Sequence, residues 1–344
     1  MSGAGAGNMI SVLILTLDEE ANLAACLDSV RFSDDVHVLD SGSSDRTADI
    51  ARARGARVTQ RPMDDWASQL NFAMRELPFH HPWVFMIDAD ERASPGLVQA
   101  MLSAVGENLP VTSFAGPEKH PLPEPPENKH RGSRGASAPG RWGPGRSEPL
   151  WQAKPFPVPT REPQADDDGQ DTAVAFSVRR RDFFLDGREL RRVQATPRYV
   201  RLFRPEHVSF SRLVNPVTHV NGPVGRLDGD LLHYPFSKGL AQWIARHNSY
   251  STLEARQELE QEARDGSRIS LRGLLHPDLS ERRRQQKLLL AQLPMRPLAR
   301  FLALYAARGG FLDGRAGLAY ALLQAWYEYM IVLKKRDLLA FPKR

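Results

Sequence analysis

Short apolar runs alternate with segments that carry apolar residues at helical spacing through the first part of the chain. Runs of this kind indicate buried strands, and the segments between them indicate amphipathic helices. Strands that alternate with helices at this spacing predict a parallel sheet built from βαβ units. The predicted strands are residues 10–16, 36–39, 57–60 and 83–87, and the predicted helices are residues 23–30, 46–54 and 66–77, with a further helix that begins at Ser94 and Pro95.

Acidic residues follow three of the four predicted strands. Asp18 and Glu19 come after the first strand, Asp40 comes after the second, and Asp88 and Asp90 come after the fourth. Each of them alone has a structural explanation, since carboxylates stabilise helix starts and occur in solvated turns. In parallel sheets, however, ligands bind beyond the carboxyl ends of the strands. Three acidic groups at equivalent positions therefore favour a binding site.

Asp88 and Asp90 are candidate metal ligands. Side chains alternate along an extended backbone, so these two carboxylates would project to one side, past the end of the strand. Two such groups can share a Mg²⁺ or Mn²⁺ ion whose other ligands are water and a diphosphate. Because an Asp-x-Asp motif is short and common, the hypothesis depends on the strand pattern that precedes it.

Composition limits the function only weakly. The 344 residues include 46 basic and 41 acidic side chains, and runs of arginine suit phosphate-bearing ligands, anionic membranes or nucleic acid. The single cysteine, Cys26, excludes an intramolecular disulfide and favours a reducing compartment. No basic segment precedes the first apolar run, so we expect no signal sequence and a cytoplasmic location, peripheral on the cytosolic face of the membrane.

Residues 107–172 are rich in Pro, Gly, Ser and charge and show no periodicity. Such a segment cannot bury enough apolar surface to offset its ordering entropy, so we predict a disordered insertion. Strand-like patterns resume beyond it, at residues 174–179 and 199–204, and residues 222–227 predict a turn-rich hairpin. We therefore divide the chain into residues 9–106, 107–172, 173–239 and 240–344.

The C-terminal part predicts helices at residues 240–264, 297–307 and 316–333. The last is nearly all apolar but barely long enough to cross a bilayer, and basic residues flank it on both sides. These flanks favour a membrane-associating helix that lies in the interface, with Trp326, Tyr327 and Tyr329 at the headgroups. The alternative is a buried pair of helices that closes the catalytic domain.

Three stretches together resemble glycosyltransferase family 2: SVLILTLDEEANL at residues 11–23, VLDSGSSDRT at residues 38–47 and MIDADER at residues 86–92. Within this inverting family, the sequence is most similar to the branch of lipopolysaccharide-core glucosyltransferases. The resemblance implies an α/β protein of GT-A type, with a mixed, mainly parallel sheet. It makes residues 9–106 the nucleotide-sugar-binding half and residues 173–239 the acceptor-side half.

The same resemblance assigns roles to individual residues. It implies that Glu19 and Asp40 contact the base and ribose, and that Asp88 and Asp90 bind the metal. A tyrosine that often stacks on the base is absent, because residues 15–19 read Leu-Thr-Leu-Asp-Glu. The other residues that match binding positions are Thr16, Gln69 and Asn71.

Two arginines of the predicted strand at residues 199–204 are candidates for the leaving diphosphate. Arginine forks suit phosphate oxygens, so we expect Arg201 or Arg204 at this place. A surface-facing arginine on a half-buried strand is the alternative for either one.

Inverting transfer needs a base that takes the proton from the acceptor hydroxyl. Relatives often carry a His-Glu pair where this chain has Thr218 and His219, so His219 is the first candidate. Histidines in loops are more often hydrogen-bonded surface residues, and His233 and Asp230 are the next choices.

We therefore expect a metal-dependent glycosyltransferase that uses a nucleotide-diphosphate sugar, first of all a UDP-sugar, and a lipid-linked or cell-envelope glycan acceptor, as in lipopolysaccharide biosynthesis. The expected partners are this donor, a glycolipid acceptor and a membrane surface, without nucleic acid. A second hypothesis is a sugar nucleotidyltransferase. Such enzymes usually need a basic, glycine-rich loop after the first strand, and this sequence has an acidic stretch there. A non-catalytic binding protein with a degenerate transferase domain is the third.

Overall fold

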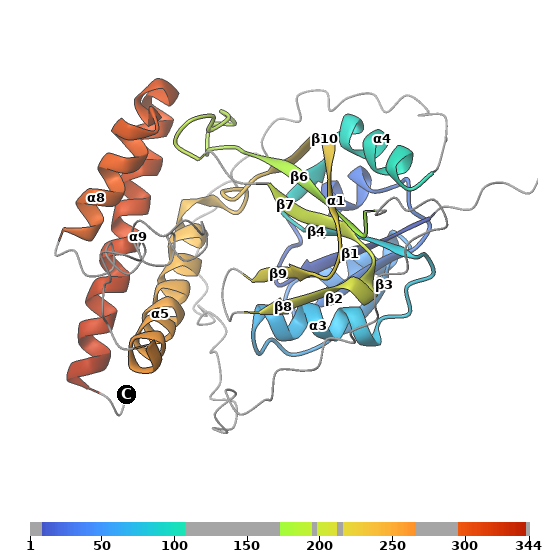
Figure 1. Ribbon diagram of the computed structural model, residues 1–344, viewed down its shortest axis with the longest axis horizontal. Coiled ribbons are helices and arrows are strands. Elements are labelled where there is room, and N and C mark those ends of the chain that lie inside the picture. Colours follow the sequence, from blue (N-terminus) through green and yellow to red (C-terminus); the bar gives the residue numbers. More distant parts are fainter. Residues whose placement is uncertain (1–8, 107–172, 195–197, 212–215, 266–294, 342–344) are drawn as a thin grey trace, which may run out of the picture.

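The computed structural model describes residues 9–106, 173–194, 198–211, 216–265 and 295–341. An α/β body holds most of them, and the C-terminal helices lie beside it (Figure 1). The predicted insertion at residues 107–172 lies outside the described residues. Its disorder, and the division of the chain at residues 106, 172 and 239, stay predictions.

Among the described residues, eight strands form one sheet in the order β3-β2-β1-β4-β7-β6-β10-β5. The first four strands of the chain pair in parallel, whereas β7 is antiparallel to β4 and β6, and β5 is antiparallel to β10. The sheet is therefore mixed, as predicted. Its strands are β1 (Ile10–Thr16), β2 (Val36–Asp40), β3 (Arg57–Gln60), β4 (Trp83–Asp88), β5 (Glu91–Ala93), β6 (Ala175–Asp182), β7 (Tyr199–Phe203) and β10 (Val224–His233).

The sheet curls because β4 and β5 are close in sequence but far apart in strand order. Only Ala89 and Asp90 separate them, yet β5 pairs with β10 at the end of the row. Helix α4 (Pro95–Ala104) packs tightly on β10, since a Cβ at Gly229 would lie 2.3 Å from the backbone nitrogen of Leu97. Only glycine fits there, and its φ of +89° also favours glycine. The curl brings the ends of β4, β6 and β10 around one space.

Helices cover both faces of the sheet because side chains alternate along each strand. Val12, Ile14 and Phe85 face one core, which α1 (Leu23–Ser29), α2 (Thr47–Ala53) and α4 cover. Leu13, Leu15 and Met86 face the other core, under α3 (Trp66–Glu76). A small hairpin of β8 (Val208–Ser211) and β9 (Val217–Val220) packs on α3 through Phe210.

Capping side chains begin two of the four helices in this body. Asp65 accepts a hydrogen bond from the backbone N–H of Ser68 at 2.9 Å and so begins α3. Ser94 accepts one from the N–H of Leu97 at 3.2 Å, and Pro95 occupies the first turn of α4. The predicted strands and helices up to α3 agree with the structure to within one residue at each end.

Two predictions for the second half need correction. The turn-rich hairpin expected at residues 222–227 is wrong, because most of this stretch belongs to the continuous strand β10. Its main-chain pairing with β6 overrides the turn preference of its glycines. The last helix, α9 (Gly314–Ala340), is longer than residues 316–333.

The C-terminal helices form a layer of their own. They comprise α5 (Gly239–Asp265), α8 (Arg296–Leu302), the π-helical turn η3 (Ala303–Ala307), the 3-10 turn η4 (Gly310–Asp313), and α9. Polar contacts join α5 to α9, since Lys334 Nζ donates hydrogen bonds of 2.8 Å to Ser251 and Thr252. No helix in the described part of the chain is long and apolar enough to cross a membrane.

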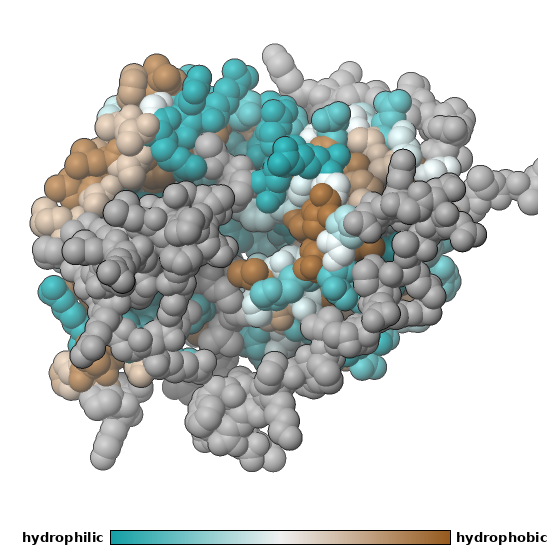
Figure 2. Space-filling model, viewed as in Figure 1, coloured by the Kyte–Doolittle hydropathy of each residue, from teal (hydrophilic) through white to brown (hydrophobic). Residues whose placement is uncertain are grey.

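The aromatic residues predicted at a membrane interface pack mainly inside this layer. Trp326 lies 6.4 Å from Trp243, and Tyr327 lies 5.3 Å from His247, measured between ring centroids. Trp326 and Tyr327 are thus partly covered by α5, and their place at the headgroups stays a prediction. Tyr329 is exposed, and other exposed apolar residues of the layer form brown patches on its outer side (Figure 2).

Candidate active site

The candidate residues gather at one edge of the sheet. There β1, β2, β4, β6 and β10 end, and β7 begins, because β7 runs antiparallel to β4 and β6. The segment that starts α5 adds Lys238 and Arg246. The site therefore combines residues from both sides of the predicted insertion.

Asp40 and Thr16 are direct neighbours at the ends of β2 and β1. Thr16 Oγ1 donates to Asp40 Oδ1 at 2.9 Å, and the backbone N–H of Ser43 donates to Asp40 Oδ2 at 3.0 Å. The hydroxyl of Ser43 is a further donor to the same carboxylate. Asp40 is fully buried and holds the turn that follows β2.

Glu19 is buried and pairs with Lys238. Lys238 Nζ lies 2.6 Å from Glu19 Oε1 and donates to the backbone oxygen of Asp18 at 3.0 Å. Burial and the nearby Asp90 raise the pKa of Glu19, and Lys238 opposes this shift. This ion pair joins the loop after β1 to the start of α5.

Arg201 is buried on β7 and bridges two carboxylates of the Asp-Ala-Asp-Glu segment. Its Nη2 lies 2.9 Å from Asp88 Oδ2 and 2.9 Å from Glu91 Oε1. Glu91 also accepts a hydrogen bond from the backbone N–H of Asp88 at 3.0 Å. Burial raises the pKa of Glu91 to about 7, although Arg201 acts against this. Glu91 is therefore a structural partner that the sequence analysis missed.

Asp90 lies in a second ion-pair cluster. Its Oδ2 is 3.6 Å from His233 Nε2 and 3.6 Å from Arg246 Nη1, and His233 Nδ1 lies 2.5 Å from Asp182 Oδ1. Burial opposes ionisation of Asp90, but His233 and Arg246 outweigh it and hold its pKa well below the usual range. Burial likewise opposes protonation of His233, but Asp90 outweighs it and raises the pKa to about 9.

The two aspartates differ in how a metal ion could reach them. The side chain of Asp88 is 38% exposed, and Arg201 occupies one of its oxygens. Asp90 is buried, and cationic partners already match its charge. No group of three or more His, Cys, Asp or Glu side chains in the described ranges is arranged to hold a metal. Magnesium commonly uses one or two carboxylates plus substrate phosphates, so this donor set fits with Asp88 as the open ligand.

Three other predicted residues have local structural partners. Asn71 exchanges two hydrogen bonds with the backbone of Phe210, at 2.9 and 3.0 Å, and so fixes β8 on α3. Gln69 is buried and donates to the backbone oxygens of Arg61 and Pro62. The guanidinium carbon of Arg204 lies 5.1 Å from the ring centroid of Trp83, which is the first residue of β4. The structure does not bring Arg204 together with Asp88, because it follows the opposite end of β7.

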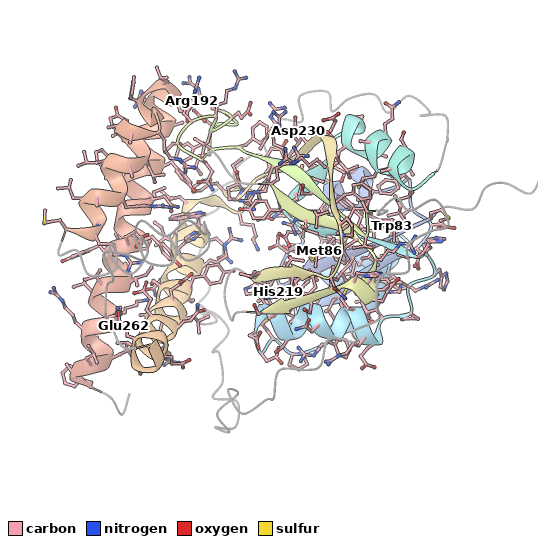
Figure 3. The ribbon with its side chains drawn as sticks, viewed as in Figure 1. Trp83, Met86, Arg192, His219, Asp230 and Glu262 are labelled. Atoms are coloured by element: carbon pink, nitrogen blue, oxygen red, sulfur yellow. The ribbon has the colours of Figure 1, made fainter. Side chains whose placement is uncertain are left out.

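The base candidates are widely separated, as Figure 3 shows for His219 and Asp230. His219 is exposed on β9, and its Nε2 lies 2.7 Å from the hydroxyl of Ser211. Asp230 forms ion pairs with Arg179 and Arg181, at 2.5 and 3.4 Å. The side chain of His233 is 14% exposed and lies between Asp90 and Asp182, and Asp90 raises its pKa to about 9.

Several cationic residues of the site were not predicted from the sequence. Arg180 on β6 pairs with Asp182 at 3.2 Å, and Lys238 and Arg246 come from the region of α5. An excess of carboxylates at one sheet edge was a signal that nearby cations would be needed, since buried charges are generally paired. Which arginines or lysines meet that need follows only from the sheet order.

The sequence also matches a known protein family. Residues 11–186, more than half of the chain, match the protein family described as Glycosyl transferase family 2. The chain belongs to that family. Its α/β fold with a mixed, curled sheet is GT-A-like, as the resemblance implied.

Individual relatives of this family 2 member match only in part. An uncharacterised glycosyltransferase of Rickettsia typhi is 40% identical over 89 residues, which are 26% of this chain and 30% of the relative. The lipopolysaccharide core biosynthesis glycosyltransferase LpsC of Rhizobium meliloti is 34% identical over 93 residues, which are 26% of this chain and 34% of the relative. The matched part is thus about a third of the length of these curated relatives.

Among solved structures, glucosyl-3-phosphoglycerate synthase of Mycobacterium tuberculosis is similar over a limited part. The identity is 30%, the match covers 29% of this chain and 40% of that chain, and the TM-score is 0.26. That structure contains Mn²⁺, UDP and glucosyl-3-phosphoglycerate.

Proposed function

We propose that this family 2 member is an inverting glycosyltransferase. Its donor is a nucleotide-diphosphate sugar, with a UDP-sugar as the first choice, and its acceptor is a lipid-linked or cell-envelope glycan. The proposal is carried by the convergence of Asp40, Asp88 and Asp90 at one sheet edge in a chain of this family. Ligands of parallel sheets bind at this edge.

In this proposal the ends of β1 and β2 bind the nucleoside. Thr16 and Asp40 hold each other, so their position does not depend on the ligand. Glu19 lies on the loop after β1 and pairs with Lys238. A base or ribose that binds here would compete for the hydrogen bonds that Asp40 now receives from Ser43.

The diphosphate would bind next to the Asp-Ala-Asp segment. Asp88 is the proposed open ligand of a Mg²⁺ or Mn²⁺ ion, with Asp90 as the second. Such an ion would screen the diphosphate and stabilise it as a leaving group. Arg201 and Arg246 add guanidinium groups, which suit phosphate oxygens. Nε of Arg246 is buried and has no hydrogen-bond partner among the described residues, so it could donate to a ligand.

His219 remains the proposed base. A base has to reach the acceptor hydroxyl in its neutral form. His219 is exposed, whereas His233 lies between two carboxylates and its pKa of about 9 favours the protonated form at neutral pH. The hydroxyl of Ser211 limits the orientations of the His219 ring.

Two observations support the proposed acceptor. One relative acts in lipopolysaccharide core biosynthesis by its name, and the C-terminal helices expose apolar surface. We infer a peripheral location on the cytosolic face of a membrane, where a lipid-linked acceptor would be within reach.

A screen of nucleotide sugars tests the proposal with the purified full chain. We expect one donor to bind and to be hydrolysed slowly in the presence of Mg²⁺ or Mn²⁺, without any acceptor. Asp88→Asn should reduce this hydrolysis by at least about 100-fold, since it removes a charge that would hold the metal and diphosphate. Asp49→Asn is the matched control, because Asp49 is an exposed carboxylate on α2.

Two outcomes would contradict the transferase proposal. Binding without any turnover of any donor would favour a nucleotide-sugar-binding protein with a degenerate transferase domain. Release of diphosphate from a nucleoside triphosphate and a sugar phosphate would favour a nucleotidyltransferase.

A further inference from the structure

Six exposed apolar side chains lie on α8, on the turn η4 and on the first half of α9. We call this surface the helical corner; it consists of Leu298, Leu302, Phe311, Leu312, Leu318 and Leu322. Phe311 and Leu312, in the turn η4 between the helices, are 53% and 64% exposed. Leu318 and Leu322 are one helical turn apart on α9, and Leu298 and Leu302 are one turn apart on α8, so each pair lies on one helix face.

The helical corner is held by close packing. A Cβ at Gly317 would lie 2.0 Å from the backbone oxygen of Gly310, so the start of α9 lies directly against η4. Asp313 accepts hydrogen bonds from the backbone N–H groups of Arg192 and Val193, at 2.9 and 2.8 Å. These contacts fix η4 between α9 and the segment after β6, so its exposed side chains have defined positions.

Arginines surround the helical corner. A pocket of about 350 Å³ beside it is lined by Arg188, Arg191 and Leu312, together with Glu189, Asp313 and Gly314. Arg308 and Arg315 are exposed at the two ends of the turn region. Figure 2 shows hydrophilic surface next to the hydrophobic surface of these helices.

The acidic groups beside the helical corner are already engaged. Asp313 accepts the two backbone N–H groups described above, and Glu189 pairs with Arg181 at 2.6 Å and with Arg191 at 3.0 Å. The side chain of Arg191 nevertheless remains 74% exposed. Exposed apolar side chains beside exposed arginines are suited to a lipid membrane with anionic headgroups. The apolar side chains would contact the acyl chains, and the arginines would contact the headgroups.

We propose that the helical corner docks this protein on an anionic membrane surface. Phe311 and Leu312 enter the boundary between headgroups and acyl chains, and Arg188, Arg191, Arg308 and Arg315 contact the headgroup phosphates. The surface differs from the one that the sequence predicted, because Trp326 and Tyr327 pack against α5 and Lys335 pairs with Glu262 at 2.6 Å. The docking itself does not depend on the proposed function. Only its role, to bring a lipid-linked acceptor near the site, rests on that function.

Cosedimentation of the full chain with lipid vesicles tests the docking without any catalysis. We expect binding to vesicles of phosphatidylethanolamine and phosphatidylglycerol, weaker binding to phosphatidylcholine, and partial release by salt, since only the charge contribution is screened. The double variant Phe311→Ser, Leu312→Ser should reduce binding at least about tenfold. Leu339→Ser is the matched control, because Leu339 is an exposed leucine at the other end of α9.

A second variant guards against misfolding. If the serine variant proves unfolded by circular dichroism, the double variant Arg188→Glu, Arg191→Glu replaces it. This variant should bind anionic vesicles more weakly than the wild-type protein. Equal binding by the two proteins would overturn the proposal. Wild-type protein that binds no vesicle while it still binds a nucleotide sugar would overturn the docking and leave the proposed function intact. Concentration-dependent dimers that Leu312→Ser abolishes, without vesicle binding, would assign the surface to a second copy instead.

Discussion

Arg201 donates from Nη2 to Oδ2 of Asp88 at 2.9 Å, although 113 residues separate them in the chain. Asp88 ends β4, and Arg201 lies on β7, the antiparallel neighbour of β4. The stretch before the predicted insertion therefore supplies the carboxylates, and the stretch after it supplies their cation. Neither stretch forms a charge-balanced site alone.

Removal of Arg201 should destabilise the protein. Arg201→Met leaves the buried Glu91 with Arg180, at 3.8 Å, in place of its closer cation at 2.9 Å, and loss of one partner of a buried ion pair typically costs about 3–5 kcal/mol. The pKa of Glu91 is already raised to about 7, and a carboxyl with a raised folded-state pKa loses stability as the pH rises above its unfolded value. The loss should therefore be larger at pH 8 than at pH 5, as measured by urea unfolding. Arg204→Met is the control, and an equal loss there would contradict this account.

Asp88 should couple metal binding to nucleotide binding. Mg²⁺ or Mn²⁺ should strengthen the binding of UDP to the wild-type protein, as measured by titration calorimetry with and without a chelator. Asp88→Asn should abolish this gain and leave the metal-free affinity nearly unchanged, because the open carboxylate serves the metal rather than the nucleoside. Equal metal dependence in both proteins would exclude Asp88 as a ligand.

His219 and His233 should respond differently to the same substitution. His219→Gln should lower kcat about 10²–10⁴-fold without a change in the melting temperature, because the side chain is exposed. His233→Gln should lower the melting temperature, because Asp90 and Asp182 lose a buried partner. Full activity of His219→Gln with its natural acceptor would remove it as the base.

His247 should make the C-terminal layer sensitive to acid. It stacks on Trp243 at 3.6 Å between ring centroids, and burial lowers its pKa to about 4. The folded state thus binds this proton more weakly than the unfolded state, whose pKa is near 6.5. The contribution of neutral His247 to the free energy of unfolding is therefore fully present above pH 6.5, and it decreases as the pH falls toward 4. His247→Phe should flatten the pH dependence of the melting temperature in this window.

The sequence alone determined the first half of the fold. Apolar runs and capping residues act within a few positions of each other, so β1 to β4, the cap at Ser94 and the acidic strand ends followed from local patterns. The motif around Asp40, Asp88 and Asp90 was visible for the same reason. Its position at strand ends requires only that the strands be parallel.

Tertiary structure decided which residues meet these carboxylates. Arg201 faces inward and Arg204 does not, because the antiparallel register of β7 on β4 sets which arginine lies beside Asp88. Lys238 and Arg246 belong to the site because the chain returns to it at the start of α5. Trp326 lies against α5 because α5 packs on that face of α9. A helix that is apolar on all sides has no local signal that decides which face meets a neighbouring helix.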